Sequence, residues 1–177
     1  MATFYTMEAA NIFVGDAGPD NSKHLKIMDI TFPVLEEKTV EHHAGGSIGA
    51  VEIGGLGINA LSLGFKLSGM DPQAMTQFGL SGSGLLNYTI YGAVRDKQVG
   101  ALIEVKCIVQ GRMVKLDPGS FKRGDMMEQT HEIKEVFRYQ LYWNKNELFF
   151  YDFFASQWRV NAIDQASDVN TILRVTN

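Results

Sequence analysis

Residues 25–69 contain two segments in which apolar and polar side chains alternate, a pattern that predicts β-strands with one dry and one wet face. In the first segment the apolar positions are Ile30, Phe32, Val34 and Val40, and the polar positions are Asp29, Thr31, Glu37 and Thr39. In the second the apolar positions are Leu61, Leu63, Phe65 and Leu67, alternating with Ser62, Gly64, Lys66 and Ser68. We therefore predict strands over residues 25–41 and 60–69, with a further extended stretch over residues 50–58.

The alternation stops between these strands, where the chain becomes rich in glycine. The residues are Glu41, His42, His43, Ala44, Gly45, Gly46, Ser47, Ile48 and Gly49. This segment is too long for a two-residue hairpin turn, and its glycines give it conformational freedom. We predict a projecting loop that pairs with another chain, disordered in the free subunit and ordered in an assembly.

The rest of the chain is dominated by further strand patterns. We predict strands over residues 86–95, 101–110, 112–116, 130–143, 147–154 and 158–163, with a break at Gly111. One helix is predicted over residues 72–78, because Asp71-Pro72 is a helix start and Ala74, Met75 and Phe78 form an apolar stripe. The sequence thus indicates an all-β domain, a sandwich or half-open barrel with one short α-helix.

We interpret residues 1–177 as a single domain with a flexible N-terminal segment and a polar C-terminal tail. Four of the predicted strands are long, so a lone subunit would leave sheet edges exposed. Such edges favour pairing with another chain.

Composition narrows the class of protein. Charged residues make up 20% of the chain, and no apolar run approaches the ~18 residues of a membrane-spanning helix, so we expect no stable membrane insertion. The N-terminus shows no export signal, and the single cysteine, Cys107, is expected to be buried and inert. Both features fit synthesis in a reducing cytoplasm. A net charge of −4 argues against sequence-specific binding of nucleic acid.

No catalytic or metal-binding constellation is evident, and we expect neither enzymatic activity nor a cofactor. The run from Gly55 to Ala60 spells G-x-G-x-x-A, but the following residues alternate as a strand instead of beginning a helix. Adjacent histidines in a strand point to opposite faces, so His42 and His43 do not converge on one metal ion.

A late aromatic cluster leaves alternatives open. Its members, on both parities of a strand, are Phe149, Phe150, Tyr151, Phe153 and Phe154. We favour packing in the core or at a subunit interface over a base-stacking platform, because no basic residues are interleaved. A carbohydrate-binding β-sandwich or adhesion module is the main alternative function, and a small cupin-like or flavin-binding enzyme ranks third.

Three blocks, in order, resemble the major tail tube protein family of contractile-tailed phages and R-type pyocins. The first is residues 32–56, with the family's L/FP-x-L-x-x-K-T spacing followed by Ala44-Gly45-Gly46. The second is residues 111–124, GRMVKLDPGSFKRG, and the third is the aromatic strand at residues 139–143. The chain departs from the family at His42-His43, where an aromatic residue and an arginine are usual.

The resemblance implies hexameric rings stacked helically, with a continuous β-barrel formed between subunits. It also implies a tail sheath outside the tube, a baseplate and a tail terminator at its ends, and a tape measure protein and DNA in the lumen. The protein would be made in the host bacterial cytoplasm and reside in the tail tube of the virion. In an R-type pyocin the same tube would carry no genome.

Two sets of residues follow as assembly and lumen candidates. The loop of residues 41–49 is the candidate contact between rings or subunits. The lumen candidates, taken from the wet face of the predicted strands, are Thr31, Glu37, Thr39, Glu52, Ser62, Lys66 and Ser68. Six subunits with a net charge of −4 carry −24 per ring, a field that keeps a polyanion moving.

Overall fold

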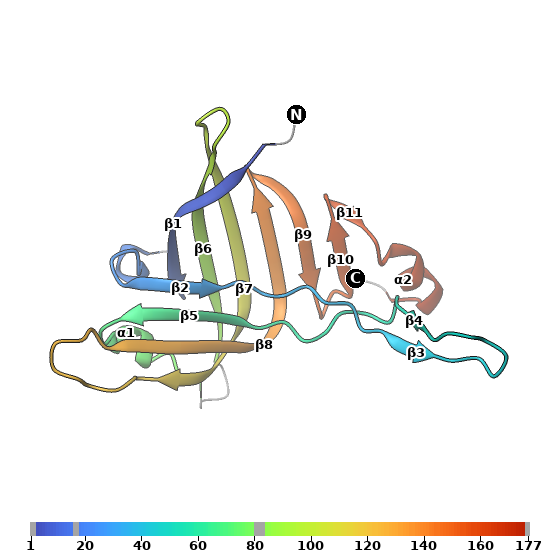
Figure 1. The fold of residues 1–177 in the computed structure, drawn as a ribbon, viewed down its shortest axis with the longest axis horizontal. Helices are drawn as coiled ribbons and strands as arrows, with labels where there is room; N and C mark the ends of the chain where they lie inside the picture. Colours follow the sequence, from blue (N-terminus) through green and yellow to red (C-terminus); the bar gives the residue numbers. More distant parts are fainter. Residues whose placement is uncertain (1–2, 16–17, 80–83, 176–177) are drawn as a thin grey trace.

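The computed structural model describes residues 3–15, 18–79 and 84–175 and has the expected all-β fold (Figure 1). Seven of its strands form a continuous antiparallel path in the order β1-β6-β7-β8-β9-β10-β11. Their bounds are β1 Tyr5–Val14, β6 Leu85–Asp96, β7 Leu102–Asp117, β8 Glu128–Trp143, β9 Asn146–Asp152, β10 Gln157–Val160 and β11 Ile163–Asp164. The strands predicted over residues 86–95, 130–143 and 147–154 are therefore confirmed, whereas the long strand predicted over residues 25–41 is not.

A second layer forms because β8 belongs to two parts of the sheet. Its first half pairs with β5 (Leu63–Ser68), from Leu63 opposite Ile133 to Ser68 opposite Glu128. Its second half pairs with β9, and β5 pairs in turn with β2 (Ile27–Thr31). The short β2–β5 layer crosses over one end of the long strands (Figure 1).

The change of direction occurs at Gly111 and Glu135. The register of β7 against β8 shifts at Gly111, and Glu135 adopts a left-handed φ of 53°. A Cβ at Gly111 would lie 2.8 Å from the Ile133 side chain and from the Lys134 carbonyl oxygen, so the two strands approach here as only glycine allows. The predicted break at Gly111 is thus a bulge inside one continuous strand, and bulges bend sheets.

The core lies between the two layers and uses one parity of each strand. Its fully buried side chains include Ile12, Leu63, Phe65, Leu67, Tyr88, Ile90, Cys107, Val109, Met113 and Ile133. The buried position predicted for Cys107 is confirmed, and burial raises the pKa of its thiol to about 12. That thiol stays protonated and unreactive at neutral pH.

Helix α1 is shorter than predicted, Pro72–Met75. Its predicted start is confirmed, since the Asp71 carboxylate accepts the backbone N–H of Ala74 at 2.9 Å and proline follows. Ala74 is fully buried, but Phe78 lies beyond the helix and is 36% exposed. The prediction that Phe78 packs as part of a helical stripe is wrong, because the helix ends one turn earlier.

Both ends of the chain are more regular than predicted. The N-terminal segment, which we expected to be flexible, contains the ten-residue strand β1, which pairs with β6 over most of its length. A 3-10 turn, η1 (Pro19–Asn21), follows it. The polar tail contains a second helix, α2 (Ser167–Leu173), which the sequence did not predict. No helix in the described ranges has the length and apolar character needed to cross a membrane.

Candidate assembly surfaces

A hairpin projects from one end of the domain, and we call residues 36–58 the arm (Figure 1). Its strands are β3 (Val40–His42) and β4 (Val51–Ile53), far shorter than the predicted strands over residues 25–41 and 50–58. Its base is closed by backbone hydrogen bonds from the Lys38 N–H to the Gly57 carbonyl and from the Asn59 N–H to the Glu36 carbonyl, each 2.8 Å. The arm is therefore held at its base by these two hydrogen bonds, and the residues beyond the base project from the domain (Figure 1).

The two faces of the arm differ in chemistry. Val40 lies opposite Ile53 and His42 opposite Val51, and these four side chains share one face. Glu41 and Glu52 lie opposite each other on the other face. All six residues are exposed.

An isolated ribbon of this kind is not expected to be stable by itself. Two-stranded hairpins are marginal in water, and like charges directly opposite each other destabilise the pair. Within the described part of the chain, neither Glu41 nor Glu52 has a cation at ion-pair distance. A partner that covers the apolar face and neutralises the acids would stabilise the arm.

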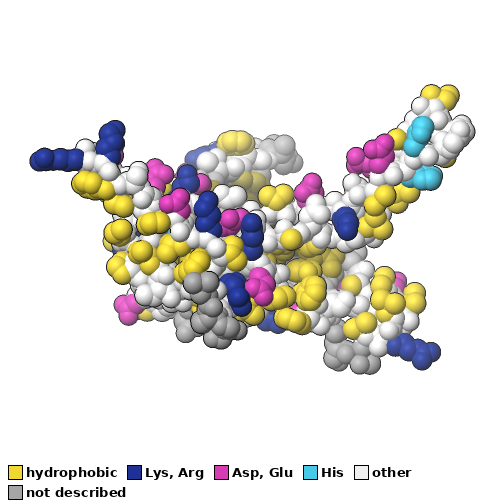
Figure 2. Space-filling view, turned by 90° about the horizontal axis from the view of Figure 1, so that it is seen from below, with side chains coloured by type: hydrophobic (Ala, Val, Ile, Leu, Met, Phe, Trp, Pro, Cys, Tyr) yellow, Lys and Arg dark blue, Asp and Glu magenta, His cyan; other side chains and the backbone are white. Residues whose placement is uncertain are grey.

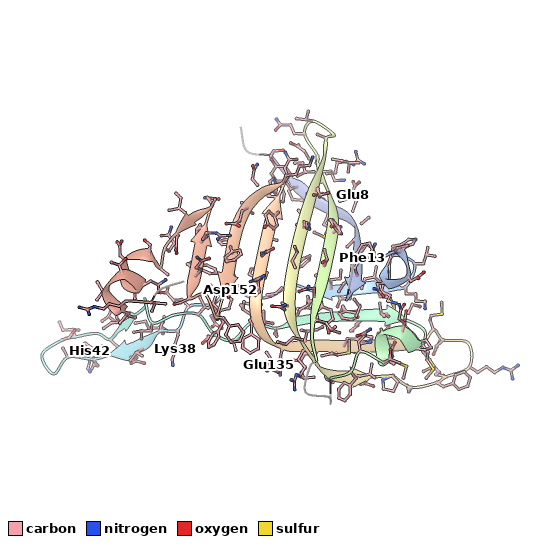
Figure 3. The ribbon with its side chains drawn as sticks, turned by 180° about the vertical axis from the view of Figure 1, so that it is seen from behind. Glu8, Phe13, Lys38, His42, Glu135 and Asp152 are labelled. Carbon is pink, nitrogen blue, oxygen red and sulfur yellow. The ribbon has the colours of Figure 1, made fainter. Side chains whose placement is uncertain are left out.

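The predicted contact loop, residues 41–49, forms the outer end of the arm. Every residue in it is exposed, and Ile48 has no contact that reduces its accessibility. The tip turns through a hydrogen bond from the Ser47 N–H to the Ala44 carbonyl at 2.9 Å. Figure 3 labels His42 on this projection, far from the body of the domain.

The structure divides the lumen candidates into two groups. Thr31, Ser62, Lys66 and Ser68 lie on the outer face of the β2–β5 layer, opposite in parity to the buried Leu63, Phe65 and Leu67. Glu37, Thr39 and Glu52 belong to the arm: the Glu37 carboxylate accepts the Gly55 N–H, and the Thr39 hydroxyl donates to Glu52 at 3.4 Å. The sequence alone did not separate these groups, because Thr31, Glu37 and Thr39 share one parity of a single predicted strand.

The outer face of the β2–β5 layer carries mixed charge. Lys66 lies 3.9 Å from Glu128, and Lys134 lies 3.1 Å from Glu132. Basic and acidic side chains are likewise interspersed across the side of the molecule in Figure 2, with the arm and its histidines projecting from it. Such a face binds no single charge strongly.

The edge strand β1 offers another surface for assembly. One side of β1 pairs with β6, whereas on its other side the described residues supply backbone partners only at Ile12 and Phe13. Most of this strand therefore presents unpaired N–H and C=O groups, which are a template for a strand from another chain.

A buried ionic cluster links the start of α1 to the segment just before β2. Lys23 and Asp71 are 3% and 2% exposed, and their charged atoms are 3.1 Å apart. Burial alone would raise the pKa of Asp71, but the Ala74 N–H and the ammonium groups of Lys26 and Lys23 hold this pKa at about 2. The carboxylate remains charged at any physiological pH, so the cluster is structural.

The outer face of the large sheet is fixed by two arginine pairs. Arg138 donates two hydrogen bonds to Asp152, at 2.8 and 2.6 Å, from β8 to β9. Arg159 donates two to Glu147, at 2.9 and 2.8 Å, and its guanidinium lies 3.6 Å from the centroid of the Phe150 ring. Asp152 can be located in Figure 3. These pairs tie β8, β9 and β10 into a rigid wall.

The aromatic cluster has two parts. Phe149 and Tyr151 pack against the core and around Trp158, as predicted. Phe153 and Phe154 are 57% and 73% exposed and surround Phe137. The exposed pair has no flat row of stacking rings, so it resembles an interface patch more than a base-binding platform.

Neither the histidine pair nor the G-x-G-x-x-A run forms a chemical site in the described ranges. No group of three or more His, Cys, Asp or Glu side chains could hold a metal ion there. The residues after the G-x-G-x-x-A run enter strand β5, so the nucleotide interpretation fails for the reason expected from the pattern.

Two surface segments were not predicted to be contacts: residues 118–127 counted as a turn and as part of the family-like block 111–124, and residues 167–173 as part of a polar tail. The β7–β8 loop, residues 118–127, exposes Phe121 and Met126 beside Lys122 and Arg123. Helix α2 exposes Val169, Ile172 and Leu173. Large apolar residues inside a turn or a polar tail were the signal available in the sequence.

Comparison with known proteins gives consistent results. The sequence model of the family described as phage tail tube protein FII matches residues 6–173. The major tail tube protein of Serratia phage KSP20 is 28% identical over 120 residues, which are 67% of this chain and 68% of that protein.

Two cryo-EM structures show the same fold at low sequence identity. A chain of the anti-feeding prophage baseplate, six-fold symmetrised, has 13% identity and a TM-score of 0.58, covering 80% of this chain and 97% of that chain. A chain of the sheath–tube complex of the extracellular contractile injection system PVC, in its extended state, has 14% identity and a TM-score of 0.52, covering 76% of this chain and 88% of that chain.

Proposed function

Because this chain belongs to the phage tail tube protein FII family, and is therefore a structural subunit of the virion tail and not an enzyme, we propose that it forms hexameric rings that stack into the inner tube of a contractile tail. The exposed arm is the single observation that carries this proposal. A two-stranded hairpin with one apolar face and two opposed glutamates is marginally stable alone, and a partner that covers it would stabilise it.

The edge of β1 supports closure of a ring. A strand from the neighbouring subunit would supply the missing backbone partners, and a closed barrel would leave no edge. Six-fold order is adopted by analogy with the related baseplate, whose structure was six-fold symmetrised.

The contact loop and lumen surface have separate roles in this proposal. Residues 41–49 make the contact between rings or subunits, supported by their complete exposure. The outer face of the β2–β5 layer, with Thr31, Ser62, Lys66 and Ser68, faces the lumen, supported by its polar and mixed-charge character. We assign Glu37, Thr39 and Glu52 to the arm contact and not to the lumen, because they lie on the arm.

The proposed partners follow from the relatives. The PVC relatives belong to a sheath–tube complex and a sheath/tube terminator, and the anti-feeding prophage relative to a baseplate. By analogy, the tube would contact a sheath outside and a terminator and a baseplate at its ends. A tape measure protein and DNA would occupy the lumen without sequence-specific contacts, and −24 per ring would discourage DNA from binding there.

Negative-stain electron microscopy of the purified protein tests the proposal. We expect hollow rings or tubes whose length increases with protein concentration. A dispersed monomer at every concentration and salt would contradict the proposal, and a monomer that also bound a glycan array would favour the carbohydrate-binding alternative.

A further inference from the structure

Resting on the proposed self-assembly, we propose that the arm of one subunit docks on the β7–β8 loop, residues 118–127, of a neighbouring copy of the same chain. The arm supplies an apolar face and two acids. The loop supplies exposed apolar side chains and two bases.

The two segments lie at opposite ends of the molecule. The arm projects from one end of the long axis, and the loop between β7 and β8 projects from the other (Figure 1). They therefore cannot meet within one subunit. A contact between them is heterologous, and contacts of this type repeat from copy to copy to give closed rings or helical stacks.

The β7–β8 loop exposes apolar side chains that could cover the apolar face of the arm. Phe121 and Met126 are 79% and 76% exposed, although both are large and hydrophobic. Val40, Val51 and Ile53 on the arm are each about half exposed, at 51%, 56% and 49%. Bringing the two sets together would remove apolar surface from water on both sides.

The loop is held in a defined shape before any contact forms. The Asp117 carboxylate accepts the Gly119 N–H at 2.9 Å, and the Asp125 N–H donates to the Lys122 carbonyl at 3.1 Å. Gly119 has a φ of +73°, and a Cβ there would lie 2.3 Å from the Glu128 carbonyl oxygen. A preformed loop loses less entropy on docking than a flexible one.

The opposite net charges of the two segments favour this loop as the docking site for the arm. The arm contains four glutamates and one lysine, a net charge of −3, and the loop contains two bases and one acid, a net charge of +1. Lys122 is paired with Asp125 at 2.8 Å, whereas Arg123 has no acidic partner within the described part of the chain. Phe121 and Met126 would cover the apolar face of the arm, and the long side chains of Lys122 and Arg123 would extend past the edge of the two-stranded arm. There they would reach Glu41 and Glu52 on the opposite face and relieve the repulsion between the two glutamates.

Charge reversal tests the pairing. Glu41→Lys with Glu52→Lys, and separately Lys122→Glu with Arg123→Glu, should each raise the protein concentration needed for tube formation at low salt by about tenfold or more. The fully exposed positions make unchanged circular dichroism and melting temperature the expected folding control. The defect should shrink at high salt, because salt screens the repulsion.

The variant that combines all four substitutions gives the decisive test of charge pairing between the arm and the loop. It restores opposite charges at every arm–loop contact, so it should form tubes at close to the wild-type concentration. Asp20→Lys with Asp168→Lys, at exposed acids outside both segments, makes the same +4 change in net charge as the arm variant; it is the matched control for that variant and should assemble normally.

Two results would overturn the inference. One is normal assembly of either double variant, and the other is a combined variant as defective as its parents. Both results are judged by comparison with tube formation by the wild-type protein. If the wild-type protein forms no tubes or rings, the proposed function fails instead, so the two failures are distinguishable.

Discussion

At the scale of single residues, the buried His131 makes the stability of this domain depend on pH. Burial lowers the pKa of its imidazole from 6.5 to about 4, although the Asp71 carboxylate opposes that shift. The ring is stacked on Phe65 with centroids 4.4 Å apart. The folded state therefore keeps His131 neutral at pH values where the unfolded chain binds a proton.

We predict that stability falls as the pH drops from about 6.5 to about 4, by on the order of 1–3 kcal/mol from this group. The variant His131→Leu should show a smaller loss over the same window. Urea unfolding at pH 7, 5.5 and 4.5 measures the difference. Parallel pH profiles for the two proteins would show that His131 is accessible to protons in the folded state. Asp71, whose folded pKa is about 2, should destabilise the fold only below about pH 4.

Because Phe78 is partly exposed, we predict that its side chain contributes only modestly to the stability of the fold. Phe78→Ala should lower the free energy of unfolding by about 1–2 kcal/mol, since a third of the side chain is already in water. Phe65→Ala, at a position 2% exposed, should cost about 3–5 kcal/mol. Equal losses in thermal unfolding would mean that Phe78 is buried in solution.

At the scale of elements, the arm should be dispensable for folding and required for assembly. Replacing residues 44–47 with Asn-Gly should leave a folded, soluble monomer, because a shorter turn can still close β3 onto β4. Circular dichroism would confirm the fold, and sedimentation would measure the loss of stacking. Tubes of normal length from this variant would rule out residues 41–49 as the contact between rings.

The order of the loop should change on assembly. Fixing each residue costs about 1–2 kcal/mol, which only a partner offsets. Amides of residues 41–49 should therefore exchange with deuterium rapidly in the free subunit and slowly in the tube. Equal exchange in both states would show that the loop stays uncovered.

Much of the fold could be predicted from the sequence, because the long strands β6 and β7 bury one parity over most of their length. The shorter elements could not. The apolar positions from Ile30 to Val40 suggested one strand, but β2 ends at Thr31, its last residue paired with β5. Pro33, two residues further on, has no N–H to donate to a ladder. Helix α2 was missed because its apolar residues face outward and only Asn170 is buried.

The candidate assembly surfaces could be predicted only in part from the sequence. The glycines of residues 41–49 mark a projection without any knowledge of the fold, and the structure has a projection there. The lumen candidates came from two different surfaces, the β2–β5 layer and the arm. Parity shows which side chains of a strand face water, but not which other molecule that surface faces. The basic β7–β8 loop gave a turn signal and part of a family-like block but no sign of a contact, because its position opposite the arm is a property of the folded chain.

At the scale of the whole molecule, weak and mixed charge on the proposed lumen face should keep DNA mobile. Thr31→Lys with Ser68→Lys would add two cations per subunit and should slow DNA release from phage particles at low salt more than at high salt. Particles carrying Thr31→Ser with Ser68→Thr serve as the control. Release that is unaffected at all salt concentrations would place this face away from the DNA.

The most direct test of the account is a cryo-EM reconstruction of the protein assembled from purified subunits. We predict stacked rings of six subunits, a β1 edge paired with the neighbouring subunit, and an ordered arm in contact with another copy. Assemblies in which β1 stays unpaired and the arm ends in solvent would contradict the claim that these surfaces build the tube.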